Sequence, residues 1–169
     1  MLCENIWGNL KDIDTTGKKI DYVEFEWDEA FKRIHKKVSR AGKEVGIRLD
    51  DSVLTKGIRT GDILWQEGDE LLAAEILPCK VIEVKLTKGH EKMAAKVCYE
   101  IGNRHAVLLW GEEEQTFLTP YTQPVLEMLE KIHGVKAEVK EQVLDFDKRI
   151  SASIPVSYTH LRAHETLSD

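Results

Sequence analysis

The chain has 169 residues, a length that can bury one ordinary hydrophobic core or two small ones. Hydrophobic residues make up 42% and charged residues 32% of it, and no apolar run approaches the roughly 20 residues of a membrane span. Its 30 acidic and 24 basic residues give a formal net charge of −6, which would repel a nucleic-acid backbone. We expect neither membrane nor nucleic-acid partners, and the lack of a signal-like start predicts a cytoplasmic location.

Residues 1–77 carry the alternation of apolar and polar side chains that is typical of strands. Val23 and Phe25 alternate with acidic residues in the first such segment, as expected where one face of a strand is buried. Residues 33–38 fit two interpretations, because their apolar residues match helical spacing as well as a strand that pairs with the next segment. We expect a small all-β domain here. Its expected strands are residues 21–27, 43–49, 63–65 and 70–77, of which the last two form a hairpin.

After Pro78 the pattern changes to strand, helix, strand, strand, helix, strand, and we place a domain boundary at this proline. This order predicts a ferredoxin-like βαββαβ domain over residues 78–150, so that the fold class of the chain is α+β. Gly102 is the expected cap of the first helix, and Gly134 is expected to end the second. Because the ferredoxin-like fold hosts many functions, it assigns none. The expected strands are residues 81–86, 106–110, 115–118 and 135–139, and the expected helices are residues 90–101 and 124–133.

Residues 151–169 are expected to form a disordered tail. From Pro155 onward the segment is polar, lacks periodicity and contains His160 and His164. It resembles translated read-through of a sequencing adaptor, so we interpret this part as non-native and exclude it from the fold. The two histidines have i, i+4 spacing, but we do not count them as metal ligands.

Three cysteines, Cys3, Cys79 and Cys98, are an odd number and include no C-x-x-C pair. Neither a disulfide framework nor a four-thiolate zinc site is therefore expected, and the thiols should be reduced. Cys98 lies seven residues before His105 on the apolar stripe of the first helix. This placement favours a buried structural thiol over a nucleophile paired with a histidine. The sequence has no Gly-rich phosphate-binding loop, so nucleotide hydrolysis would belong to a partner.

His105 is the strongest candidate for a functional residue. It follows Gly102-Asn103-Arg104 at the junction between the first helix and the next strand. Its imidazole is a ligand that suits nickel, copper and zinc. A single histidine beside a core strand is more often a packing or surface residue, so its spacing alone assigns no role. We expect His35 and His133 to be exposed and His90 to lie at a helix start, and we give these three no metal role.

Four segments resemble one known protein family. The sequence in these segments is similar to the UreE family of urease accessory proteins. The resemblance implies an amino-terminal β domain similar to a peptide-binding module of chaperones, followed by a ferredoxin-like domain. It also implies a homodimer in which His105 of each subunit binds nickel at the interface. The segments are residues 44–49 (EVGIRL), 61–64 (GDIL), 98–105 (CYEIGNRH) and 124–129 (PVLEML), in the family's order.

The resemblance predicts a non-enzymatic nickel metallochaperone that delivers Ni²⁺ to urease during assembly of the active site. Its implied partners are the GTPase UreG and the activation complex of the urease apoprotein. Zn²⁺ and Cu²⁺ are expected competitors at His105, because imidazole binds all three ions. A second interpretation is a peptide- or client-binding adaptor in which metal binding is incidental. A third, ranked last, is a small hydrolase that uses Cys98 and His105.

Overall fold

A computed structural model describes residues 1–151 of the chain. The described residues divide into two compact units, Met1–Pro78 and the part of the chain from Cys79 onward. The first unit is rich in strands and the second combines helices with a sheet, so the predicted α+β class is confirmed. Among the helices of the described residues, none is long and apolar enough to cross a membrane. The tail expected from residue 151 lies, beyond that first residue, outside the described part of the chain.

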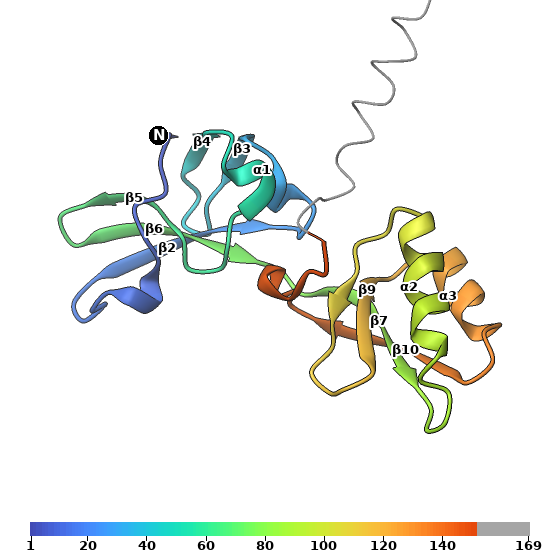
Figure 1. Ribbon diagram of the computed structural model, residues 1–169. Coiled ribbons are helices and arrows are strands. Elements are labelled where there is room, and N and C mark those ends of the chain that lie inside the picture. Colours follow the sequence, from blue (N-terminus) through green and yellow to red (C-terminus); the bar gives the residue numbers. More distant parts are fainter. Residues whose placement is uncertain (152–169) are drawn as a thin grey trace, which may run out of the picture. The chain divides into compact units, whose positions relative to one another are not determined.

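The first unit contains two three-stranded sheets. One has the strand order β1-β4-β3 and the other the order β2-β6-β5 (Figure 1). The expected sheet-rich amino-terminal part is therefore confirmed. The strands are β1 (Leu2–Cys3), β2 (Lys19–Phe25), β3 (Ile34–Val38), β4 (Glu44–Arg48), β5 (Ile63–Glu67) and β6 (Glu70–Ile76). The helical turns are η1 (Leu10–Asp12), η2 (Glu29–Phe31) and α1 (Val53–Lys56).

The alternation of the sequence accounts for burial in this unit. In β2, Val23 and Phe25 are buried while Glu24 between them is exposed. Residues 33–38, which fitted either a strand or a helix, form the strand β3. It pairs antiparallel with β4, where His35 lies opposite Ile47. A strand prevails here because a helix would leave the backbone groups of β4 on that side without hydrogen-bond partners.

Strands β5 and β6 form the predicted hairpin. Glu67 pairs with Glu70, so the turn between the strands consists of the two intervening residues. Gly68 opens this turn with a φ of 58°, a left-handed conformation that glycine adopts readily because it has no Cβ.

The second unit is a four-stranded antiparallel sheet with two helices on one face (Figure 1). The strand order is β10-β7-β9-β8, so the first and last strands of the βαββαβ unit are neighbours, as in a ferredoxin-like domain. The strands are β7 (Cys79–Leu86), β8 (Leu109–Trp110), β9 (Thr116–Pro120) and β10 (Val135–Gln142). The helices are α2 (Met93–Asn103) and α3 (Gln123–Glu130), and the turn η3 (Phe146–Lys148) follows β10.

Two elements of this unit begin three residues later than predicted. The strand expected from Ala106 begins at Leu109, because the N–H of Ala106 is engaged with the carbonyl of Ile101 at 3.2 Å in the turn that ends α2. The helix expected from residue 90 begins at Met93. Before it the chain forms a turn in which the N–H of His90 donates to the carbonyl of Thr87 at 3.0 Å.

One apolar cluster holds the helices against the sheet. Val97 and Ile101 of α2 are buried in it, and so are Val125 and Leu129 of α3. In each helix the two residues are four positions apart, which places them on the same side. Helix α3 is also capped at its start, where Oγ1 of Thr122 accepts the N–H of Val125 at 3.4 Å. The packing of both helices therefore follows from the helical spacing of apolar residues in the sequence.

Leu129→Ala should lower the free energy of unfolding by about 2–5 kcal/mol, because the substitution leaves a cavity in the buried cluster. Leu126→Ala on the same helix removes the same atoms from a half-buried position and should cost less. Chemical denaturation monitored by circular dichroism measures both losses. A loss for Leu129→Ala no larger than that for Leu126→Ala would contradict the packing of α3.

Candidate metal centre

The hydrogen bonds that end helix α2 hold His105 in place. The N–H of His105 donates to the carbonyl of Gly102 at 2.9 Å, and the N–H of Ala106 donates to the carbonyl of Ile101 at 3.2 Å. This pair of bonds is a Schellman motif, in which the residue after the helix cap takes a left-handed conformation. His105 is that residue, with a φ of 57°. The imidazole is therefore attached where the chain leaves the helix, at a defined backbone position.

The left-handed residue corrects the predicted helix cap. Gly102 was expected to end the helix but lies inside α2, and His105 occupies the position that most often holds glycine. The helix continues past Gly102 because the carbonyl of the buried Ile101 pairs with Ala106. A left-handed conformation costs an L-residue roughly 1–2 kcal/mol, and backbone strain of this kind is concentrated at functional sites.

His105 is exposed, so a metal ion in solution can reach its imidazole. Within residues 1–151 there is no group of three or more His, Cys, Asp or Glu side chains that could hold a metal ion. An ion bound by His105 would therefore need further ligands from water or from a second subunit. His105 by itself therefore does not complete a nickel site.

Cys98 is placed as a structural thiol. It lies on the side of α2 that packs against the apolar cluster, where it is half-buried. Burial raises the pKa of its thiol above the ordinary value of 9.0. The thiol therefore stays protonated at neutral pH, and a protonated thiol is a poor nucleophile. This environment disfavours the hydrolase interpretation.

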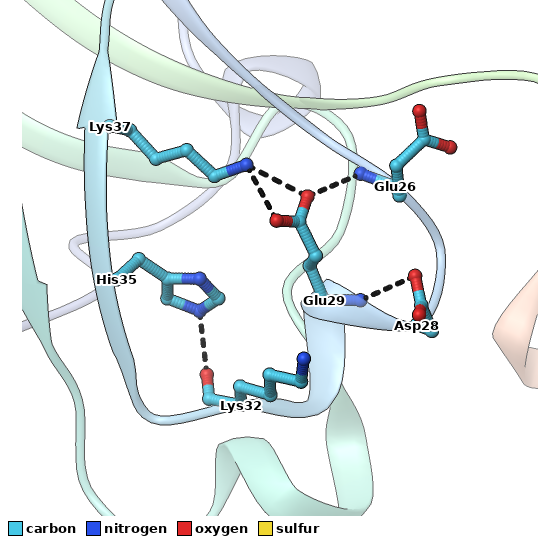
Figure 2. Close-up of polar contacts among 6 residues, drawn as sticks. All are labelled: Glu26, Asp28, Glu29, Lys32, His35 and Lys37. Carbon is cyan, nitrogen blue, oxygen red and sulfur yellow. Dashed lines mark hydrogen bonds and ion pairs between the residues drawn. The ribbon is translucent and has the colours of Figure 1, made fainter.

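His35 is buried, so the predicted exposure of this residue is wrong. The pleat of β3 turns the side chain inward, and its ring meets Phe25 edge to face with centroids 5.1 Å apart. Its Nε2 donates to the carbonyl of Lys32 at 2.8 Å (Figure 2). Burial is the main cause that lowers the pKa of His35 below its ordinary value of 6.5. The imidazole is therefore neutral at pH 7 and serves packing.

Charged residues beside His35 are also engaged in structural contacts (Figure 2). Nζ of Lys37 donates to both carboxylate oxygens of Glu29, at 2.9 and 2.7 Å, and lies 5.2 Å from the ring centroid of Phe25. Glu29 also accepts the N–H of Glu26 at 2.9 Å. These contacts join the turn η2 to β3, so we assign the cluster to the fold and not to metal binding.

The structure brings together two histidines that sequence analysis left without a metal role. Nε2 of His90 lies 3.2 Å from Nε2 of His133, and the rings meet edge to face with centroids 4.8 Å apart. His133 is exposed as predicted, whereas His90 is half-buried in the turn before α2. The two residues are 43 positions apart but flank the strand pair β7–β10, in which Leu86 lies opposite Val135. The ferredoxin-like strand order is the signal that could have predicted this contact.

Two family models match the chain. The N-terminal domain of the UreE urease accessory protein matches residues 3–77, and the C-terminal domain matches residues 79–167. The urease accessory protein UreE of Helicobacter acinonychis is 42% identical over 155 residues, which cover 92% of this chain and 89% of that protein. UreE of Helicobacter pylori strain G27 is 41% identical over 157 residues, with coverage of 93% and 90%. UreE of Helicobacter bizzozeronii is 34% identical over 155 residues, with coverage of 92% and 85%.

The fold and the matched domains define an accessory protein with a sheet-rich first domain and a second domain of helices and strands. The chain belongs to the UreE family of urease accessory proteins. The family resemblance inferred from four sequence segments is therefore confirmed. The family name describes an accessory role and not a catalytic one, so the expectation that the protein is not an enzyme is confirmed as well.

His105→Gly should raise the free energy of unfolding by about 1 kcal/mol, because glycine has no Cβ to oppose the left-handed conformation. Asn103→Gly, at the last residue of α2, is the matched control and should lower it, because glycine disfavours the helix. Chemical denaturation of the two variants and the parent measures both changes. Destabilisation by His105→Gly would contradict the proposed strain.

The stability of the protein should decrease as the pH falls through 6.5, in part because of His35. Its pKa is lowered in the folded protein, so the unfolded chain binds the proton more tightly and protonation favours unfolding. The stabilisation by neutral His35 is complete above pH 6.5. It is lost as the pH falls from there through the lower pKa that His35 has in the folded protein. His35→Gln, which keeps an N–H for the carbonyl of Lys32, should weaken this pH dependence.

Chemical denaturation between pH 7.5 and 5 measures this effect. Lys36→Gln changes an exposed residue on the same strand, and it should keep the pH dependence of the parent. The same pH dependence in His35→Gln and in the parent would exclude His35 as the group responsible.

Proposed function

We propose that the protein is a nickel metallochaperone that delivers Ni²⁺ to urease during assembly of the active site. The observation that carries this proposal is the exposed His105, held in a left-handed conformation at the end of α2 in a member of the urease accessory family. Neutral imidazole is a good nickel ligand. A histidine where glycine would be less strained fits selection for binding better than selection for stability.

The nickel site requires a homodimer in this proposal. One subunit offers one imidazole at His105, and no cluster of three ligating side chains supplements it within residues 1–151. Two subunits related by a twofold axis would supply the same residue twice, as symmetric dimers do at their axis. Tyr99 lies one turn before the end of α2 and is 68% exposed, so its side chain would be available to such an interface.

A site with two protein imidazoles suits a carrier. Nickel prefers more than two ligands, so water or mobile side chains would complete its coordination. Such ligands exchange easily, which allows the ion to pass to an acceptor, whereas a site closed by protein ligands would retain it. Zn²⁺ and Cu²⁺ would compete for the same imidazoles.

The acceptors in this proposal are the GTPase UreG and the activation complex of the urease apoprotein in the cytoplasm. The sequence contains no G-x-x-x-x-G-K-[ST] motif, so nucleotide hydrolysis would be supplied by the partner. The membership of the chain in a family of urease accessory proteins supports this assignment of partners.

A peptide- or client-binding adaptor is the second candidate, and one surface of the first unit favours it. Strand β3 is an edge strand on which Ile34 and Val38 are 72% and 64% exposed. Leu2 on β1, at the other edge of the same sheet, is 57% exposed. An exposed edge with apolar side chains can accept an extended peptide as an additional strand. This function would be compatible with nickel transport, because it uses the other unit.

Isothermal titration of the untagged protein with Ni²⁺ tests the metal proposal. We expect a tight step of about one ion per dimer with micromolar or lower Kd, and His105→Ala should remove this step without dissociating the dimer. Asn103→Ala, two residues away in the same turn, serves as the control and should retain the step. A tight step of unchanged stoichiometry in His105→Ala would exclude this residue as the ligand, and a monomeric parent protein would exclude the shared site.

A further inference from the structure

We propose that His90 and His133 form a second metal site, which binds one divalent transition-metal ion such as Ni²⁺ in each chain. This site is separate from His105. His90 lies before the start of α2 and His105 lies after its end, and a helix of 11 residues is about 16 Å long. One ion cannot contact both residues of the same chain. The second site therefore adds to the proposed nickel transport and does not depend on it.

The separation of the two donor atoms fits a common metal ion. Nε2 of His90 and Nε2 of His133 are 3.2 Å apart. Two imidazoles bound to one ion at about 2.0–2.1 Å, with an angle between 90° and 109°, place their nitrogens about 2.9–3.4 Å apart. The exposed ring of His133 has room to rotate toward a shared ion. The pair is therefore already at the distance that binding requires.

Hydrogen bonding to Thr87 prepares His90 as a ligand. The hydroxyl of Thr87 has a single proton, and Oγ1 donates it to the carbonyl of Gly134 at 3.0 Å. The contact of 2.9 Å between Oγ1 and Nδ1 of His90 must therefore use a proton on Nδ1. This tautomer leaves a lone pair on Nε2, the nitrogen that faces His133. Metal-binding histidines characteristically donate their second N–H in this way.

The same tautomer explains the contact of the two rings without metal. Nε2 of His90 accepts a hydrogen bond, and Nε2–H of His133 donates it across the 3.2 Å separation. When a metal ion binds, it would take the place of the proton on Nε2 of His133, and the ring of His133 would carry its proton on Nδ1 instead. Only the hydrogen bond between the two rings is lost in this change.

The backbone around the pair is held firmly. The carbonyl of Gly134 accepts two hydrogen bonds from Thr87, one from its N–H at 2.9 Å and one from its hydroxyl at 3.0 Å. Gly134 has a φ of 79°, and a Cβ at this position would collide with the ring of His90. The loop before α2 and the loop before β10 are thus joined at the residues that carry or contact the imidazoles. Rigid support of this kind lowers the cost of bringing two ligands together.

The small number of protein ligands predicts weak and exchangeable binding. Lys88, Lys92 and Lys131 are close in sequence to the two histidines, but so are Glu91 and Glu130, so the nearby charges largely offset one another. No third His, Cys, Asp or Glu joins the pair in a cluster that could hold a metal within the described residues, so water would occupy the other positions. We therefore expect weaker binding than at the shared site of the dimer.

Titration of the untagged His105→Ala protein with Ni²⁺ tests this site in the absence of the first one. We expect a remaining step of about one ion per chain, which is lost when His133→Ala is added. His133 is exposed, so this substitution should not affect folding. Thr87→Val should weaken the step about 10–100-fold, because it removes the hydroxyl that orients His90, and Thr87→Ser should retain it.

His35→Gln in the same background is the matched control. His35 is buried and hydrogen-bonded to the carbonyl of Lys32, so this substitution should leave the step unchanged. Paramagnetic Ni²⁺ should also broaden the imidazole NMR signals of His90 and His133 first. Absence of the step in His105→Ala would overturn the second site, as would a step that persists after His133→Ala. If His105→Ala removes only the tight step of one ion per dimer and keeps the step of one ion per chain, the second site is supported. That loss bears only on the site proposed at His105.

Discussion

The burial of Ile101 is the constraint on which the position of His105 depends. Its side chain is fully enclosed between α2 and the sheet, so the last turn of the helix cannot shift without opening a cavity. Its carbonyl accepts the N–H of Ala106, and the chain between them turns through the left-handed His105. The packing of the core thus determines where an exposed imidazole stands. A histidine is less favourable than glycine at this turn, so stability and the proposed metal binding make opposite demands on one residue.

The antiparallel pairing of β7 with β10 has a comparable effect at the other end of α2. It places the loop that follows Leu86 next to the loop that precedes Val135, and Thr87 joins the two through Gly134. Two histidines far apart in the sequence become neighbours as a result. In both arrangements the imidazoles lie on turns that backbone hydrogen bonds and a packed sheet hold in place. Functional side chains are often found on such turns, because a rigid scaffold fixes their position.

The periodicity of the sequence was sufficient to predict most elements, because burial on one face imposes a repeat of about two residues on a strand and of about 3.6 residues on a helix. The alternation around Val23 and the apolar stripe through Val97 both correspond to buried faces. Predictions about single residues were less successful. His35 was expected to be exposed, but residues 33–38 form a strand, and its pairing with β4 decided which side chains turn inward. Gly102 was expected to cap α2, but the bond between Ala106 and Ile101 moved the left-handed residue to His105.

Sequence alone was enough to determine the fold class and the family, because local periodicity and contiguous motifs are properties of neighbouring residues. It also supplied His105 as the candidate metal ligand. The left-handed backbone of His105, the burial of His35 and the contact between His90 and His133 required the folded structure. Each of these depends on strand register or on the closing of a turn against the core. The strand pairings join residues that are distant along the chain, so no local pattern in the sequence records them.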